Sequence, residues 1–328
     1  FSATEPDTGN ELWRSDGTEG GTIPLKDINP GPDSSSPHSL TKVGDALFFW
    51  TDNGTLWKTD GTTAGTTLVK DINSNGSNSS SPSDLVAVGG YVYFTADDGI
   101  NGREIWRSDG TAAGTMIWGN ISAMGDSNPQ ELTVFGGVVY FSADDDVNGR
   151  ELWYANGATT DIVKDIYAGF NTSYPTNFHA LGSYLYFRAV DPASGQELWR
   201  TDGTEAGTQL VENLSDGDDN SDPDAGVSLG NFLYFSAYDQ VNDARYVYRT
   251  SGSTVERVPF AMDPAQYLNC DCFGTHIFAV GATLYSTSYS ATYGSEFSYL
   301  IEPTAALPST SQNGVGAHLV LIQLAALT

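Results

Sequence analysis

Two acidic stretches of the sequence have the residue types and the spacing of a calcium site. One reads D-x-D-x-N-G from Asp144 to Gly149, and the other gathers aspartates between residues 216 and 224. Ca²⁺ prefers oxygen ligands at alternate positions of a turn that contains glycine. The twelfth position of the first stretch is Ala155 instead of glutamate, so this is not an EF-hand. The calcium candidates are Asp144, Asp146, Asn148, Asp216, Asp218 and Asp222; the alternative is that both stretches are solvated acidic turns.

Unlike polar residues recur five positions before a glycine that marks each repeat of the chain. They are Ser39, Asp84, Glu131, Asn177 and His276. A ring of such groups could bind a small ligand or carry out acid–base chemistry. The alternative interpretation is that they are ordinary polar residues at the start of a strand.

Sequons of the form Asn-X-Ser/Thr suggest modification by glycans. They begin at Asn53, Asn75, Asn78, Asn120, Asn171 and Asn213, and all lie in or next to expected loops. In a host with the modification machinery, we expect glycans on some of them. The alternative is that asparagine is simply common in loops.

Signals for catalysis are weak. Residues 226–230 match G-x-S-x-G around Ser228, but Ser228 is expected inside a strand with no helix after it, whereas a nucleophile elbow needs strand, sharp turn and helix. Histidines show no ligand spacing, and the two cysteines, Cys270 and Cys272, provide neither a disulfide framework nor a zinc site. The sequence therefore predicts a protein that is not an enzyme.

The net charge of −27 limits the partners. Such a surface repels nucleic acid and anionic membranes, and it favours cationic partners, calcium above all. No apolar stretch approaches the roughly 20 residues of a membrane-spanning helix, so no membrane span is expected.

A repeated phrase shows which elements position these residues. ELWRSDGTEGGT at 11–22 returns as TLWKTDGTTAGT at 55, EIWRSDGTAAGT at 104 and ELWRTDGTEAGT at 197. The aromatic residue of the phrase recurs every 44 to 51 residues, at Trp13, Trp57, Trp106, Trp153, Trp199, Tyr248 and Tyr299. Seven units of this period indicate a repeat architecture.

Each unit is expected to form four short strands, as at 83–89, 91–96, 102–110 and 114–121. The second strand is apolar on consecutive positions, as in YVYF at 91–94, so both of its faces must be covered. These features predict an all-β fold, a seven-bladed β-propeller of four-stranded antiparallel blades in one domain, 1–328. Residues 302–328 would be a spacer and closing strand, with 315–324 pairing with 11–15 to close the ring.

The repeated phrase is interpreted as a structural part. Asp-Gly begins a tight connection between the third and fourth strands, in which Asp and Thr side chains hold loop amides. Asp16, Asp60, Asp109 and Asp202 are therefore expected to be turn residues instead of ligands. The glutamates that start the third strand, such as Glu11 and Glu104, are expected to bond nearby backbone or arginine.

Antiparallel blades predict one uniform and one variable face. The variable face, a name kept below, carries the loops between the second and third strands and those between units, such as 144–151 and 167–175. Loops on a rigid scaffold commonly carry binding. The polar residues before the repeat glycine would lie on this side, at the mouth of the central channel.

The phrase resembles the bacterial ELWxxDGT tandem-repeat family of secreted and surface proteins, which are generally regarded as propeller-like. The resemblance covers roughly residues 1–215 and implies location and architecture without a reaction. We therefore expect a secreted or cell-surface binding or adhesion propeller, with a glycan or a surface protein as its partner. The alternatives are a glycan-active enzyme that uses the channel mouth and a structural subunit that polymerises head-to-tail through its terminal strand.

Overall fold

The chain forms antiparallel β-sheets throughout the part that the structure describes. The structure, a computed structural model, describes residues 1–74, 80–215, 217–224, 226–258, 277–280, 283–290 and 294–300. Within these ranges there is no helix. Five sheets have four strands each, and the first and last sheets have three. The predicted all-β class is confirmed.

The strands follow one another along the chain. Their bounds are β1 Ser2–Glu5, β2 Gly9–Arg14, β3 Ile23–Lys26, β4 His38–Val43, β5 Ala46–Trp50, β6 Thr55–Thr59, β7 Thr67–Asp71, β8 Ser83–Val88, β9 Tyr91–Asp97, β10 Arg103–Ser108, β11 Met116–Gly119, β12 Gln130–Phe135, β13 Val138–Asp144, β14 Arg150–Ala155, β15 Thr160–Lys164, β16 Thr176–Leu181, β17 Tyr184–Asp191, β18 Gly195–Thr201, β19 Gln209–Glu212, β20 Val227–Leu229, β21 Phe232–Asp239, β22 Ala244–Thr250, β23 Val255–Arg257, β24 Ile277–Val280, β25 Thr283–Ser290 and β26 Gly294–Leu300.

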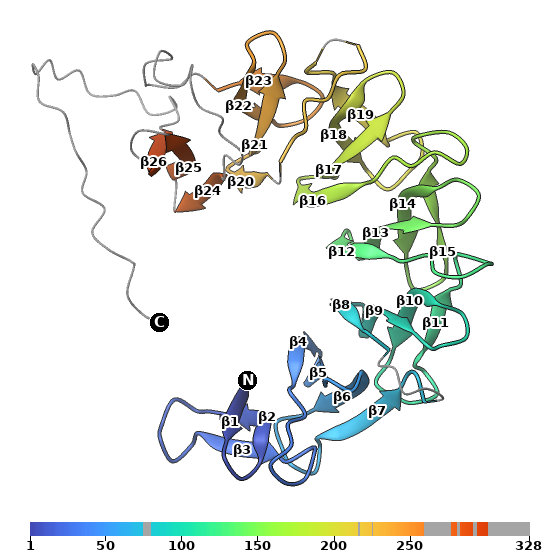
Figure 1. Cartoon of the computed structure of the whole chain (residues 1–328), viewed down its shortest axis with the longest axis vertical. Helices are drawn as coiled ribbons and strands as arrows, with labels where there is room; N and C mark the ends of the chain where they lie inside the picture. The colour runs from blue at the N-terminus through green and yellow to red at the C-terminus, as the bar shows by residue number, and fades with distance from the viewer. Residues whose placement is uncertain are drawn as a thin grey trace, which may run out of the picture.

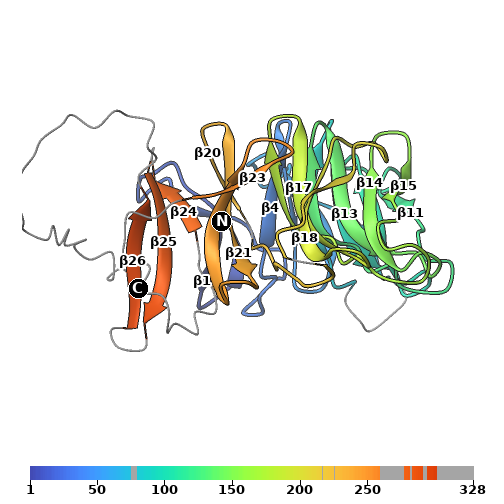
Figure 2. The same cartoon turned by 90° about the horizontal axis from the view of Figure 1, so that it is seen from above.

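The sheets are arranged in an arc like the blades of a propeller (Figure 1). Strands within each sheet pair in chain order, so β4, β8, β12, β16, β20 and β24 each start a sheet. These strands line the inside of the arc, and Figure 2 shows the strands running across its thickness. The propeller-like arrangement therefore agrees with the prediction.

The hydrophobic core lies between neighbouring sheets. Phe48 and Trp50 of the second sheet pack in one cluster with Phe94 and Trp106 of the third. The ring centroids of Trp50 and Phe94 are 4.9 Å apart in an edge-to-face contact, a favourable arrangement for aromatic pairs. Strand β9 is buried on consecutive positions because it is covered by a sheet on either side.

The repeated tryptophan contributes to a contact between sheets. Lys26 at the end of β3 places its ammonium group 5.6 Å from the ring centre of Trp57 in the next sheet, and it donates a hydrogen bond of 2.7 Å to the carbonyl of Thr66. Lys70 and Lys164 repeat the contact with the tryptophans of their following sheets. Each cation–π contact of this kind stabilises by about 0.5–1 kcal/mol or more.

The predicted ring closure is not seen in the described residues. Two of the sheets have three strands, and the arc is open between the first sheet and the last (Figure 1). Strand β2 pairs with β1 on one side and with β3 on the other, so the predicted pairing of 11–15 with a C-terminal strand is wrong. The segment 302–328 itself lies outside the described residues.

Candidate functional site

The repeated phrase folds into a turn that satisfies its own polar groups. One carboxylate oxygen of Asp60, Oδ1, accepts hydrogen bonds from the N–H of Thr62 at 2.8 Å and from its hydroxyl at 2.7 Å. The same hydroxyl accepts the N–H of Gly65 at 2.9 Å. The pattern repeats at Asp16, Asp109 and Asp202. The hydrogen bonds from threonine lower the pKa of these aspartates. This geometry fits the structural interpretation of the motif.

The glutamates of the repeated phrase anchor the loops of the variable face. The carboxylate of Glu151 is fully buried and accepts hydrogen bonds from Ile166 N at 2.9 Å and Tyr167 N at 3.2 Å. It also accepts the N–H and the hydroxyl of Ser173. Glu11, Glu104 and Glu197 hold their loops in the same way. These glutamates therefore bond the backbone, as expected, and a buried serine.

The buried glutamates predict that the fold loses stability as the pH rises. Burial raises the pKa of Glu151 and of Glu197 to about 7, against a usual value of 4.5. Between pH 4.5 and 7 the folded chain keeps a proton on these glutamates that the unfolded chain has released. Their protonation therefore contributes stability that is complete below pH 4.5 and is lost as the pH rises through 7. We expect the melting temperature to fall between pH 5 and pH 8 at constant ionic strength, with a shallower slope in Glu151→Gln/Glu197→Gln. A wild-type melting temperature that rises over this range would contradict the assignment.

The short loops of the variable face are built as rigid turns. In 98–102, Oδ1 of Asp98 accepts the N–H groups of Ile100 at 2.9 Å and Asn101 at 2.7 Å, and the Asn101 amide donates to Oδ2. Asp145 forms the same three bonds in 145–149, and Asp239 forms two of them in 240–243. Each turn therefore presents the aliphatic residue between its aspartate and asparagine to solvent.

The most exposed large apolar side chains gather on the variable face. Among the described large hydrophobic residues, the highest exposed fractions are those of Met124 88%, Val241 82%, Phe170 81%, Ile100 75%, Val147 59% and Tyr174 58%. Three of them, Ile100, Val147 and Val241, occupy the same place in their turns. These apolar residues were not predicted from the sequence, although their recurrence before asparagine is visible there.

The first calcium stretch does not form a described cluster of ligands. Asp144 accepts the N–H of Asp146, whose own carboxylate accepts the hydroxyl of Ser122. The amide of Asn148 donates to Asp145. In the second stretch Asp222 pairs with Arg188 at 3.2 Å, Asp218 is exposed, and Asp216 lies outside the described residues. Across the described ranges no three His, Cys, Asp or Glu side chains are grouped to hold a metal ion, and calcium binding stays a prediction.

Four of the six sequons can be placed. The asparagine side chains of Asn53, Asn120, Asn171 and Asn213 are exposed in loops of the variable face. Asn75 and Asn78 lie outside the described residues. Glycosylation stays a prediction.

The channel-mouth residues share an unusual backbone conformation. Ser39, Asp84, Glu131 and Asn177 have φ values of +53°, +54°, +57° and +61°, and the pairing of each strand with its neighbour shifts at this point. Such bulges re-aim a side chain, and this conformation is uncommon outside glycine. Glu131 and Asn177 are brought together, since a Glu131 oxygen accepts the N–H of Asn177 at 2.6 Å. His276 lies outside the described residues, as do Cys270 and Cys272.

A serine–histidine contact joins two strands on the inside of the arc (Figure 1). Nε2 of His179 on β16 is 2.7 Å from the hydroxyl oxygen of Ser228 on β20. Burial lowers the pKa of His179, which favours the neutral ring. Ser228 lies within strand β20, as expected, and the G-x-S-x-G stretch has no strand–turn–helix geometry. The contact joins two residues that are 49 positions apart in the sequence.

Arginines near the channel mouth were also missed. The guanidinium group of Arg103 donates to the hydroxyls of Ser83 and Thr95, both at 2.7 Å. Arg150 and Arg245 occupy the same position in later sheets and bond the loop before the innermost strand. In the fifth sheet this position is Gln196, and Arg188 on the adjacent strand bonds Asp222 instead. These cations hold the loops of the variable face to the sheets.

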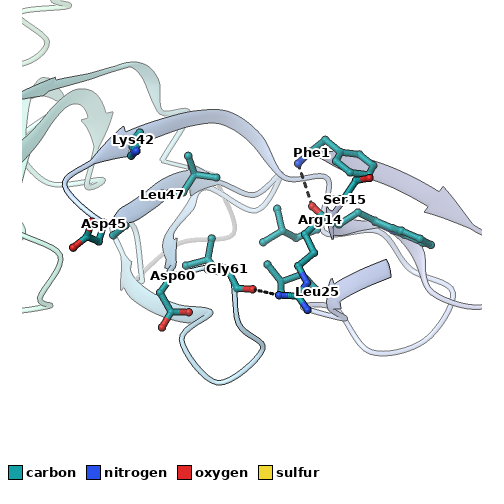
Figure 3. A pocket seen from close by; sticks show the side chains of 13 residues that line it. Phe1, Arg14, Ser15, Leu25, Lys42, Asp45, Leu47, Asp60 and Gly61 are labelled. Atoms are coloured by element: carbon teal, nitrogen blue, oxygen red, sulfur yellow. Dashed lines mark hydrogen bonds between the residues drawn. The ribbon is translucent and has the colours of Figure 1, made fainter. Parts of the chain in front are cut away.

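A cavity of about 400 Å³ lies between the first two sheets. Phe1, Arg14, Leu25, Lys42 and Asp60 are among the residues around it (Figure 3). The amino group of Phe1 donates to the carbonyl of Trp13 at 3.2 Å, and Arg14 donates to the carbonyl of Gly61 at 3.0 Å. The cavity borders the first sheet, which has three strands. Its wall combines apolar side chains with polar groups that already bond the backbone, so we assign the cavity no ligand.

Comparison with known proteins yields similarity in structure alone. No protein-family model matches the chain, and no curated protein matches it. The computationally designed Ika8 protein is 16% identical with a TM-score of 0.47, over 88% of this chain and 80% of its own. A prolyl endopeptidase is 12% identical with a TM-score of 0.47, over 80% of this chain and 41% of its own. A putative TolB from Agrobacterium tumefaciens is 13% identical with a TM-score of 0.37, over 65% of this chain and 76% of its own.

These similarities are too low to support a conclusion about activity. Among the described residues no helix is long and apolar enough to cross a membrane.

Proposed function

We propose that this chain is a binding module without enzymatic activity, acting outside the cell or on its surface, whose variable face docks on a partner. The supporting observation is that, among the described residues, the six most exposed large apolar side chains lie on that face. Single exposed apolar residues are normal on a protein surface, whereas a concentration on one face is typical of an interaction site.

The construction of the loops also favours docking. Ile100, Val147 and Val241, called here the tip residues, stand on turns whose amides are held by aspartate. The longer loops that carry Met124 and Phe170 are tied to the sheets by buried glutamates. A surface that is ordered before binding loses less conformational entropy when it binds. Exposed apolar groups on rigid loops are therefore suited to contact.

Serine at the three tip residues is expected to abolish or strongly weaken adhesion without unfolding the protein. Each tip residue is more than half exposed, so its replacement should change stability by about 0.5 kcal/mol or less. The matched control is serine at Ile23, Leu68 and Met116, which are exposed by 37%, 50% and 41% on the outermost strands of three sheets.

The measurement is the retention of beads that carry each protein on immobilised glycans, extracellular proteins and whole cells. Wild-type and outer-strand variants should be retained on the same surface, and the tip variant at least tenfold less. Equal retention of the two variants, or no retention of wild type on any surface, would contradict the proposal.

A further inference from the structure

We propose, as a step that rests on the function proposed above, that the partner is a polypeptide surface that presents lysine or arginine around apolar side chains. The segments 259–276 and 291–293 lie outside the described residues. In the connecting segments of the variable face that precede them, every charged side chain is an aspartate. These segments contain no lysine, arginine or histidine; they are residues 6–8, 27–37, 51–54, 72–82, 98–102, 120–129, 145–149, 165–175, 192–194, 213–226 and 240–243.

The arginines next to these loops already form hydrogen bonds or an ion pair within the chain. Arg103, Arg150 and Arg245 are half-buried and donate to hydroxyls or carbonyls of the chain. Arg188 is paired with Asp222. Exposed aspartates such as Asp146 remain at the surface, so the potential over the loops is negative. A surface of one sign attracts a partner of the opposite sign and repels nucleic acid and anionic lipid.

A partner that matches only the negative charge of the variable face would leave its exposed apolar side chains without a contact. A free metal ion would leave the exposed apolar side chains of the loops in contact with water. A purely cationic polymer would leave the tip residues in water, although they are among the most exposed large apolar side chains described, together with Met124 and Phe170. The tip residues are aliphatic and lack the ring faces on which neutral sugars stack; the most exposed rings described on this face, Phe170 and Tyr174, both belong to the loop 165–175. A basic and apolar polypeptide satisfies both features.

The test uses three short helical peptides of equal length as probes. One places leucine at every third or fourth position among lysines, so that leucine forms one face of the helix. The second replaces lysine by glutamate, and the third replaces leucine by serine. Fluorescence anisotropy gives the dissociation constant of each with wild type, the tip variant and the outer-strand variant, at low and at physiological salt. The serine peptide measures attraction by charge alone.

We expect the lysine–leucine peptide to bind wild type more tightly than the serine peptide does, and the glutamate peptide not to bind. Raising the salt should weaken binding, because the attraction between exposed charges is screened. The tip variant should lose at least tenfold in affinity for the lysine–leucine peptide and keep its affinity for the serine peptide. The outer-strand variant should match wild type with both.

Two results would overturn the inference: binding of the glutamate peptide as tight as that of the lysine peptide, or equal affinity of the tip and outer-strand variants for the lysine–leucine peptide. Adhesion that depends on the tip residues in the bead assay, together with either result, would mean that the docking face is correct and the partner class wrong. If the tip and outer-strand variants behave alike in both the bead assay and the peptide assay, the proposed function is wrong as well.

Discussion

Replacement of Glu151 by alanine is expected to lower the free energy of unfolding by about 3 kcal/mol or more, because it leaves several buried hydrogen-bond donors without an acceptor. The carboxylate accepts three backbone N–H groups, from Ile166, Tyr167 and Ser173, and the hydroxyl of Ser173. Each buried donor without an acceptor costs about 1 to 3 kcal/mol, and water entering the site offsets part of that cost.

The same change should loosen the loop 165–175, which carries Phe170 and Tyr174. Denaturant unfolding measures the stability, and the rate of chymotrypsin cleavage after Phe170 measures the loop. The matched control is Glu205→Ala, in the exposed turn of the repeated phrase in the fifth sheet. If Glu151→Ala and Glu205→Ala unfold at the same denaturant concentration, the buried glutamates do not anchor the loops.

Alanine at Gly65 is expected to cost about 1 to 3 kcal/mol of stability, because it overpacks the turn of the repeated phrase. A Cβ atom at this position would lie 2.0 Å from Oδ1 of Asp60, so the carboxylate would have to leave its bonds with Thr62. Binding through the variable face should survive in the fraction that remains folded, because the turn lies on the opposite side of the arc.

The control lies at the neighbouring position of the same turn. Gly20 in the first copy of the phrase has no atom within 4 Å of an added Cβ, and the copies at 55, 104 and 197 carry alanine there. Gly20→Ala should therefore leave the melting temperature almost unchanged. A Gly65→Ala variant as stable as Gly20→Ala would mean that the aspartate does not hold this turn.

The strands and their order could be predicted from the sequence because the repeats report the same pattern several times. The predicted strands at 83–89 and 91–96 correspond to β8 at Ser83–Val88 and β9 at Tyr91–Asp97. Consecutive apolar residues in β9 predicted burial on both faces, and the sheets on either side provide it. Closure could not be predicted in detail, because β1 already occupies the edge of β2 that the closing strand was expected to take.

The details of the site depend on contacts between sheets, which the order of residues does not reveal. His179 and Ser228 are 49 positions apart and meet because β16 and β20 lie at the inside of successive sheets. In the fourth sheet Arg150 on β14 bonds the loop before the innermost strand, whereas in the fifth sheet Arg188 on β17 bonds Asp222. Which strand supplies the arginine depends on which of them faces the loop. The left-handed backbone at Glu131 also has no signal in the side chain, since glutamate has no preference for that conformation.

Hydroxyl-radical footprinting of the bound protein tests the docking face most directly. Met124 is 88% exposed and Phe170 is 81% exposed on the variable face, whereas Met116 on an outermost strand is 41% exposed and provides an internal reference in the same chain. On the surface that retains the beads, or in complex with the lysine–leucine peptide, the oxidation rates of Met124 and Phe170 should fall several-fold while that of Met116 stays at its unbound value. Protection of Met116 with Met124 and Phe170 still reactive would contradict the account.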